Sequence, residues 1–566
     1  MPPAPADLTG RGRLRRWSRL LWVEAAAQRA ELGRQPGLPL GVGLRISEGP
    51  AGMVYRFETL SDSNVPEGTT AKLRIEASEY PAEVLHRGDN EITLFVEQAE
   101  DGVPPVKAQV ATLVSDPVFL TEELGKRMSE FAEKPVISAP LERLLGLCSG
   151  ARLEPHPESH VVPPEIDLND EQHALIAAAL VEPVWFGWGP PGTGKTTALG
   201  AYVAEAAIRN ERLLVTAHSN VAVDAALVAT VNELQARGKS RLVERGATLR
   251  LGVAQLRAAQ SLRLSARELV LAARPDLDRA RRDMEDRIRR GRLSPDDVAN
   301  LRRQLGDLRS EIRRLEGELI GTARILFCTL PKIALDPRIH DSLQVDAVIV
   351  DEASMALPPQ VALAAALAKT RLTIFGDFRQ LAPIVISSDD GVLTELGRDI
   401  FAHTGVSKSV DMGTVPTGVS MLEVQHRMHP EIRRVVSDLS YLGRLRDGTG
   451  VAARTTPFGG ADPKPGHPVV VINTRLEASR GWRDRGHGSR LNPVSALWST
   501  RFVVEALRTC TTVALLTPYR AQVHLLTALV RDLGLRERVT VGTIHRMQGS
   551  EASAVVVDLV DAKPLG

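Results

Sequence analysis

The fold of this chain is decided by Gly189-Pro190-Pro191-Gly192-Thr193-Gly194-Lys195-Thr196, which directly follows the apolar run 184–188 and precedes a helical pattern. This order predicts a strand, a glycine-rich loop and a helix. Glycines let backbone N–H groups close around phosphate oxygens at a helix N-terminus. Lys195 would reach the β and γ oxygens, and the Thr196 hydroxyl would ligate Mg²⁺. The predicted phosphate-binding residues are Gly189, Gly192, Thr193, Gly194, Lys195, Thr196 and Thr197.

A second motif argues against a chance match in a glycine-rich turn. Residues 345–350 form an apolar strand pattern that ends in Asp351 and Glu352. α/β sheets bind their ligands at the carboxyl ends of strands. We expect Asp351 to hold Mg²⁺ and Glu352 to polarise the attacking water. An isolated Asp-Glu pair is more often a solvated turn, but the upstream loop favours a catalytic pair, so the two motifs predict ATP hydrolysis.

Two longer strings follow, Phe375-Gly376-Asp377-Phe378-Arg379-Gln380-Leu381-Ala382-Pro383 and Gln425-His426-Arg427-Met428-His429-Pro430. With residues 168–172 before them and 548–551 after them, the chain resembles superfamily 1 helicases, in the branch that includes the nonsense-mediated-decay RNA helicase. The resemblance implies two RecA-like domains that hydrolyse ATP between them. It also implies roles for four single residues: Gln172 at the adenine edge, Gln380 as γ-phosphate sensor, Arg427 as arginine finger and Glu551 at the ribose.

Ordinary alternatives exist for these single residues. Arg427 could be a surface ion pair and Gln380 a helix-capping amide; only their placement within the motifs favours the catalytic roles. The family pattern also proposes contacts to single-stranded nucleic acid, through hydroxyl and amide groups at strand ends that suit phosphate binding. Threonines at such positions often only cap the next turn. The proposed nucleic-acid contacts are Ser219, Asn220, Thr329, Thr517 and Thr543.

The chain departs from the family pattern in two ways. His426 stands where many relatives have a tyrosine, and His218 where a proline is common, so adenine stacking by His426 is doubtful. The chain also ends at Gly566, before the family's last arginine-bearing motif. We therefore expect an incomplete second RecA-like domain, either because the chain is a fragment or because a partner chain completes the domain. An arginine finger contributes about 10³–10⁵ in rate in related enzymes, so Arg427 alone could leave hydrolysis slow.

Composition sets further bounds. The length of 566 residues predicts several domains. A net charge of +1 means that any nucleic-acid contact must come from a local groove. No apolar run approaches the ~18 residues of a membrane helix, so we expect no membrane partner. The arginine-rich N-terminus also lacks the apolar segment and cleavage site of a signal peptide, so we expect a cytoplasmic protein. Three scattered cysteines, Cys148, Cys328 and Cys510, fit buried positions in a reducing compartment.

The expected organisation is an α/β protein with accessory modules. Residues 13–34 read as a basic amphipathic helix that packs and carries no functional weight, and short alternating runs predict a β-barrel. Leucines and isoleucine at 301, 305, 308, 312, 315 and 319 predict a coiled-coil seam, packed in a hairpin against residues 277–288 through a turn with Ser294 as N-cap. The expected ranges are 1–36 (helix), 37–116 (barrel), 117–166 (helical segment and linker), 167–385 (first RecA-like domain, with a hairpin insertion at about 256–320) and 386–566 (second RecA-like domain).

The sequence thus predicts an ATP-driven helicase or translocase on single-stranded DNA or RNA. The alternative is an ATP-gated binding or scaffold subunit that clamps nucleic acid without unwinding it. Strand displacement separates the two. The barrel or the hairpin could instead dock a protein partner, or serve as a structural spacer.

Overall fold

The computed structural model describes residues 10–32, 37–49, 52–59, 65, 70–76, 78–87, 91–96, 105–108, 110–115, 117–151, 167–244, 246–289, 295–453, 467–473, 481–483, 489–544 and 551–561. The predicted linker from residue 153 to 166, the hairpin turn with Ser294 and the string 548–550 lie outside this part. The chain divides into two compact units, residues 1–87 with 92–423, and residues 88–91 with 424–566.

A seven-stranded parallel sheet forms the centre of the first unit, in the order β10-β11-β9-β12-β13-β8-β14. Its strands β8, β9, β11 and β12 read as near-continuous apolar, buried runs, as expected for parallel strands covered on both faces. The outermost strand, β14, lies beyond the expected boundary at residue 385 and pairs with β8. The strands are β8 (Val184–Trp188), β9 (Leu213–Ala217), β10 (Thr248–Arg250), β11 (Ile325–Thr329), β12 (Val345–Asp351), β13 (Ala368–Gly376) and β14 (Val419–Met421).

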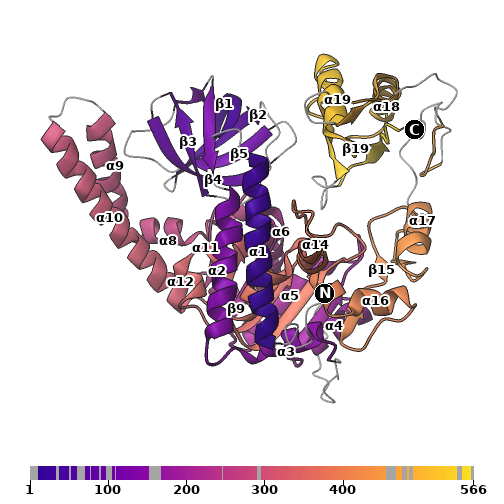
Figure 1. The fold of residues 1–566 in the computed structure, drawn as a ribbon, viewed down its shortest axis with the longest axis horizontal. Coiled ribbons are helices and arrows are strands. Elements are labelled where there is room, and N and C mark those ends of the chain that lie inside the picture. Colours follow the sequence, from indigo (N-terminus) through magenta and orange to yellow (C-terminus); the bar gives the residue numbers. More distant parts are fainter. Residues whose placement is uncertain are drawn as a thin grey trace. The chain divides into compact units, whose positions relative to one another are not determined.

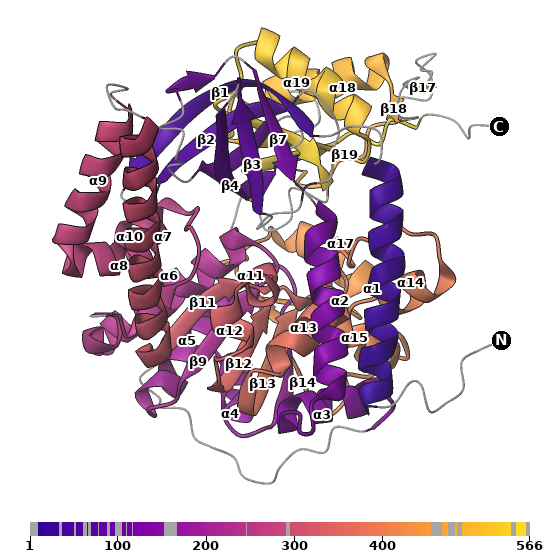
Figure 2. The same ribbon diagram turned by 60° about the vertical axis from the view of Figure 1, so that its left-hand side comes forward.

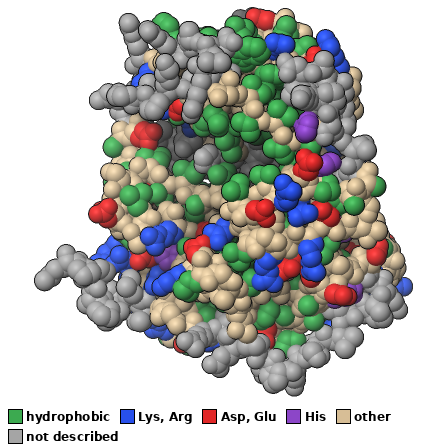
Figure 3. Space-filling model, turned by 90° about the vertical axis from the view of Figure 1, so that its right-hand side faces the viewer, with side chains coloured by type: hydrophobic (Ala, Val, Ile, Leu, Met, Phe, Trp, Pro, Cys, Tyr) green, Lys and Arg blue, Asp and Glu red, His purple; other side chains and the backbone are tan. Residues whose placement is uncertain are grey.

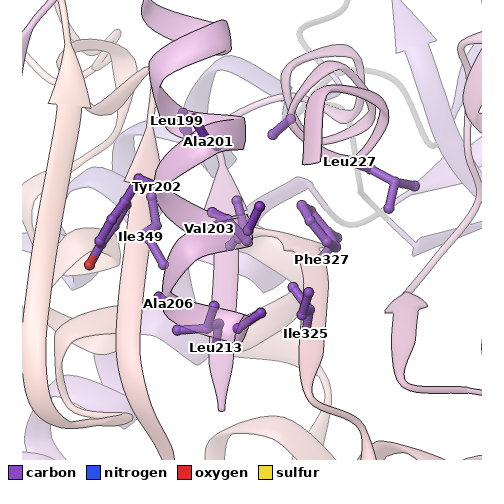
Figure 4. Close-up of a cluster of buried hydrophobic side chains, with 14 of the residues drawn as sticks. Leu199, Ala201, Tyr202, Val203, Ala206, Leu213, Leu227, Ile325, Phe327 and Ile349 are labelled. Carbon is purple, nitrogen blue, oxygen red and sulfur yellow. The ribbon is translucent and has the colours of Figure 1, made fainter. Parts of the chain in front are cut away.

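The main core lies between this sheet and its helices. Figure 4 shows Tyr202 and Val203 of α5 near Leu213 of β9 and Ile349 of β12, and all four side chains are buried. The helices that belong to the same part of the first unit are α4 (Asp170–Ala179), α5 (Lys195–Ile208), α6 (Asn220–Ala236), α11 (Leu330–Leu335), α12 (Pro337–His340), α13 (Pro358–Ala365), α14 (Asp390–Glu395), α15 (Ile400–His403) and α16 (Val406–Asp411).

An antiparallel sheet precedes the parallel one in the chain. Its strands follow the order β2-β5-β4-β3-β7-β1-β6, and β1 also pairs with β2, so the ladder returns to its starting strand. Its inward side chains, such as Tyr55, Phe57 and Leu73, are fully buried. The strands are β1 (Leu38–Gly49), β2 (Gly52–Thr59), β3 (Thr70–Ile75), β4 (Ser78–Arg87), β5 (Glu91–Val96), β6 (Lys107–Ala108) and β7 (Ala111–Ser115).

Two long helices flank this sheet in sequence. α1 (Gly10–Leu32) precedes β1, α2 (Pro117–Glu133) follows β7, and Figures 1 and 2 show the two side by side. The amphipathic pattern predicted for residues 13–34 is reflected in α1, where Leu14, Trp17 and Leu21 are fully buried. The shorter α3 (Ala139–Cys148) comes next in the chain.

The described residues of the predicted insertion form the helices α7 (Arg257–Leu262), α8 (Ala266–Ala273), α9 (Pro275–Arg289) and α10 (Pro295–Thr322). α9 and α10 lie side by side in both ribbon views. Ile312 of the predicted seam is buried with Val270, Leu271 and Leu277, and Leu308, Leu315 and Leu319 pack against them.

The second unit is built around a parallel sheet in the order β20-β19-β21, with a core between it and the helices α18 and α19. Its elements are β15 (Val424–Gln425), α17 (Pro430–Ser440), β16 (Arg446–Asp447), β17 (Trp482–Arg483), β18 (Arg490–Leu491), α18 (Pro493–Ala506), β19 (Val513–Thr517), α19 (Arg520–Asp532), β20 (Val539–Thr543) and β21 (Ala554–Val557).

The next two observations concern the cysteines and the length of apolar helices. The three cysteines are buried and unpaired, as predicted. In the described part of the chain, no helix combines the length and the apolar character that crossing a bilayer requires.

Two glycines in helices provide a matched test of this packing. A Cβ on Gly200 of α5 would lie 2.8 Å from Ala229 of α6, whereas a Cβ on Gly306 of α10 would meet nothing within 4 Å. We expect Gly200→Ala to destabilise the protein by about 1–3 kcal/mol through overpacking. Gly306→Ala should stabilise it by about 0.5–1 kcal/mol, because alanine favours the helix. Denaturant unfolding of both variants measures this; equal effects would contradict the close α5–α6 approach.

Candidate nucleotide-binding site

The glycine loop joins β8 to α5 in the way the sequence predicts. Gly192 and Gly194 adopt left-handed backbone conformations, with φ of 79° and 75°, that favour glycine. A Cβ on Gly189 would lie 2.8 Å from the Cβ of Lys195, so the loop folds closely over that side chain. Thr193 is buried, Thr196 half-buried and Thr197 exposed. The loop therefore presents the first turn of α5, with its backbone N–H groups, as a cradle suited to phosphate.

Lys195 lies between the two carboxylates that the sequence singled out. Its Nζ is 2.9 Å from Oδ1 of Asp351 and 2.6 Å from Oε1 of Glu352. Burial alone would lower the pKa of Lys195, but the two carboxylates together raise it above its ordinary value. Burial raises the pKa of Asp351, with Lys195 opposing and Glu352 adding to that rise. The cluster has two formal negative charges and one positive charge, which suits a cation held with a polyphosphate.

The backbone at Glu352 is unusual for a residue with a side chain. Its φ is 50°, in the left-handed region, directly after β12. The Glu352 N–H donates to Oδ1 of Asp351 at 2.8 Å, which stabilises the turn. Such strain is common at functional sites. Here it directs the two neighbouring carboxylates to the same amine.

Gln172 holds the glycine loop from α4. Its Nε2 donates to the carbonyls of Thr193 at 3.3 Å and Gly194 at 3.4 Å. Its Oε1 accepts from the backbone N–H of Asn169, and the backbone N–H of Gln172 donates to Oδ1 of Asn169. These two bonds form a capping box. The Asn169 cap was not predicted, although an asparagine followed three residues later by a glutamine is the sequence pattern of a capping box. In this structure Gln172 positions the loop.

Gln380 follows β13 and is exposed. Its Nε2 donates to Oδ2 of Asp377 at 2.6 Å, and Oδ1 of Asp377 accepts from Nε1 of Trp188 at 3.0 Å. Trp188 is the last residue of β8, immediately before the glycine loop. Asp377 and Trp188 together connect the Gln380 turn to the start of that loop, a role that was not predicted for either residue.

The parallel register lines up the expected nucleic-acid contacts of the first unit. Thr329 and Asp351 both pair with Ala217, so β11, β9 and β12 end at one edge. The Ser219 hydroxyl accepts from the Ala222 N–H and caps α6. Thr329 is buried at the start of α11.

Asn220 is 2% exposed and committed to internal contacts. Its Nδ2 donates to the Leu85 carbonyl of β4 at 3.3 Å, and its Oδ1 accepts from Nη2 of Arg250 at 2.8 Å. In this structure its amide joins the antiparallel sheet to α6 and β10.

In the second unit, Thr517 and Thr543 are register partners at the ends of β19 and β20, and both are buried. The Arg427 guanidinium forms an ion pair with the Glu551 carboxylate. The turn before Arg427 is set by Gln425, whose Oε1 accepts from the N–H groups of Arg427 and Met428 at 2.8 and 2.6 Å. This role of Gln425 in shaping the turn was not predicted from the sequence.

Surface charge gives no single basic patch on the face drawn in Figure 3. There, Lys and Arg side chains are interspersed with Asp and Glu among the described residues. This mixture agrees with the net charge of +1 for the whole chain.

Comparison with known proteins places these motifs in a family. Two family models match, and each is described as an AAA domain. One matches residues 167–290 and 266–388, and the other matches residues 404–565. The ATP-dependent helicase NAM7 of Saccharomyces cerevisiae is 26% identical over 72% of this chain and 40% of its own length. The regulator of nonsense transcripts 1 homolog of Arabidopsis thaliana is 25% identical over 71% of this chain and 31% of its own length.

A third relative, the DNA polymerase alpha-associated DNA helicase A of Schizosaccharomyces pombe, is 26% identical over 66% of this chain and 55% of its own length. The chain thus spans only about a third to a half of these curated relatives. Among solved structures, the arterivirus nonstructural protein 10 (helicase) aligns with 73% of this chain and 58% of that chain at 13% identity and a TM-score of 0.29, a likeness too small to carry an argument.

A pair of substitutions tests the positioning by Gln172. Asn169→Ala removes the side chain that caps the backbone N–H of residue 172. Gln172→Ala keeps that cap bond but removes the reciprocal bond from the Asn169 N–H and both bonds to the glycine loop. We expect each to lower stability by about 1 kcal/mol. Only Gln172→Ala should also weaken nucleotide binding clearly, because the loop loses its anchor. Titration with a fluorescent ATP analogue measures this. Equal affinities for the two variants would contradict a positioning role.

Proposed function

We propose that this chain is an ATP-driven helicase or translocase on single-stranded nucleic acid, because it belongs to the superfamily 1 helicases, in the branch that includes the nonsense-mediated-decay RNA helicase. The observation that carries the proposal is the partly buried contact of Lys195 with Asp351 and Glu352. It joins the glycine loop to the end of β12, the arrangement that nucleotide hydrolysis needs.

The proposal assigns each residue of the site a task. Lys195 would exchange a carboxylate partner for phosphate oxygens when ATP enters. Asp351 and Thr196 would hold Mg²⁺, which neutralises charge on the phosphates when bound. Glu352 would orient the attacking water, and Gln380 would contact the γ-phosphate. The residues present fit these tasks, since the hard carboxylate oxygens of Asp351 and Glu352 meet the Lys195 amine at the start of α5, next to the glycine loop.

We further propose two RecA-like domains, the first within residues 167–423, because β14 pairs with β8, and the second within residues 424–566. The antiparallel sheet of residues 37–116 would be a β-barrel accessory domain, and α9 with α10 a helical hairpin that docks a protein or nucleic acid. Support comes from the parallel order of both α/β sheets and from the closed ladder of β1 to β7. Arg427 and Glu551 would then separate from each other to contact nucleotide. A cytoplasmic location is supported by the three buried, unpaired cysteines.

Glu352→Gln tests the proposal. The variant should bind ATP but turn it over about 10²–10⁴-fold more slowly, because the amide cannot accept a proton from water. Glu311→Gln, an equal change of charge on the exposed surface of α10, serves as the control. ATP turnover with and without single-stranded DNA and RNA is measured for all three proteins. Unchanged turnover in Glu352→Gln would contradict the catalytic assignment.

Strand displacement then separates the two readings of this ATPase. A helicase should unwind a duplex with a single-stranded overhang in an ATP-dependent reaction that Glu352→Gln abolishes. ATP-dependent retention of the strand with no displacement would favour an ATP-gated clamp instead. The polymer that stimulates turnover more strongly identifies the track.

A further inference from the structure

A buried carboxylate of α1 reaches the segment that follows Gln380. Glu24 is 1% exposed. Its Oε1 accepts from the backbone N–H of Ile386 and its Oε2 from that of Ser387, each at 2.9 Å. Hydrogen bonds to an ionised acceptor are stronger than neutral ones. Glu24 therefore binds two consecutive peptide N–H groups of a segment that is distant in sequence.

The segment that links the Gln380 turn to Ile386 and Ser387 is irregular. Residues 381–389 contain neither helix nor strand. At its start, the carboxylate of Asp377 accepts from Trp188 and from Gln380. At its far end, Glu24 binds the N–H groups of Ile386 and Ser387. Gln380 thus stands in a stretch of chain that is fixed on both sides.

α1 also holds the next helix, α14. Glu395 at the end of α14 accepts from Nη1 of Arg13 at 3.3 Å and from Nε1 of Trp17 at 3.2 Å, and it pairs with Arg16 at 3.1 Å. A Cβ on Gly391 would lie 3.0 Å from the side chain of Leu20, so the helices are in close contact. The whole stretch from Ile386 to Glu395 therefore rests on α1.

We propose that Glu24 is a positioning residue for the phosphate-sensing turn that carries Gln380. This inference rests on the proposed ATPase function. Catalysis depends on reacting groups being held closely, and a displacement of about 1 Å can reduce a rate about 10²-fold. Without the carboxylate, residues 381–389 lose the far anchor, and Gln380 samples more positions. The expected effect is on the chemical step and not on nucleotide binding, because Glu24 lies outside the glycine loop.

Glu24→Gln is the test variant, because its amide presents an N–H group to one of the two peptide donors. Glu31→Gln, at an exposed position on the same helix, is the control with the same change of charge. In the full chain, with single-stranded nucleic acid present, we expect Glu24→Gln to lower kcat for ATP about tenfold or more. Its KM should stay within about twofold, because the contacts that bind ATP are unchanged. Glu31→Gln should match the wild type in both constants.

Hydrogen exchange provides a readout that a merely structural role would not give. The amides of Ile386 and Ser387 should exchange faster in Glu24→Gln, while the amides of α5 and β12 keep their protection. Faster exchange throughout the first unit, with kcat falling only as the folded fraction falls, would overturn the proposal. If Glu24→Gln does not fold, Gln28→Ala replaces it, since Gln28 donates to Oε1 of Glu24 at 3.0 Å. That variant should lower kcat by a smaller factor, and an unchanged kcat would overturn the role.

The outcomes also separate this inference from the proposed function. A wild-type chain without ATP turnover overturns both. A wild-type chain with turnover that Glu24→Gln leaves unchanged overturns only the role of Glu24.

Discussion

The ion contacts of Lys195 are the constraint on which the rest of the first unit depends. A buried amine requires a compensating charge, and here two carboxylates from the end of β12 supply it. Lys195 begins α5, so this contact fixes where the helix starts relative to the sheet. β13 lies between β8 and β12, which means that the ends of three adjacent strands must align. The parallel register shows this alignment, since Gly376 pairs with Trp188 just before the loop.

Much of this centre could be predicted from sequence because its signals are local. The glycine loop, the apolar strand before it and the strand that ends in Asp351 each occupy a few consecutive residues. The leucine spacing of α10 is equally local, and most of its positions pack in the structure as that spacing predicts. Such features depend on backbone conformation and periodicity, which a short stretch encodes by itself.

The environments of single polar residues were less predictable, because they depend on residues distant in sequence. Nothing near Asn220 shows that its amide meets Leu85 of β4 and Arg250 of β10. The same applies to α1, for which the amphipathic pattern indicated a packed face but not the buried Glu24. A helix pattern shows which face is covered; it does not show which backbone donors the covering segment offers.

Two buried carboxylates accept hydrogen bonds from peptide N–H groups of irregular segments in different parts of the first unit. Oδ2 of Asp224 accepts from the N–H groups of Gln255 at 2.5 Å and Leu256 at 3.0 Å, where the chain enters the helical insertion. Glu24 does the same for Ile386 and Ser387, where the chain leaves the Gln380 turn. In each place an irregular segment needs partners for its peptide N–H groups, since unpaired buried donors are unfavourable. Directional bonds of this kind fix a segment in one position, whereas apolar packing alone permits sliding. A carboxylate of α6 thereby fixes the entry to the helical insertion, and a carboxylate of α1 fixes the segment after the Gln380 turn, although neither pair adjoins in sequence.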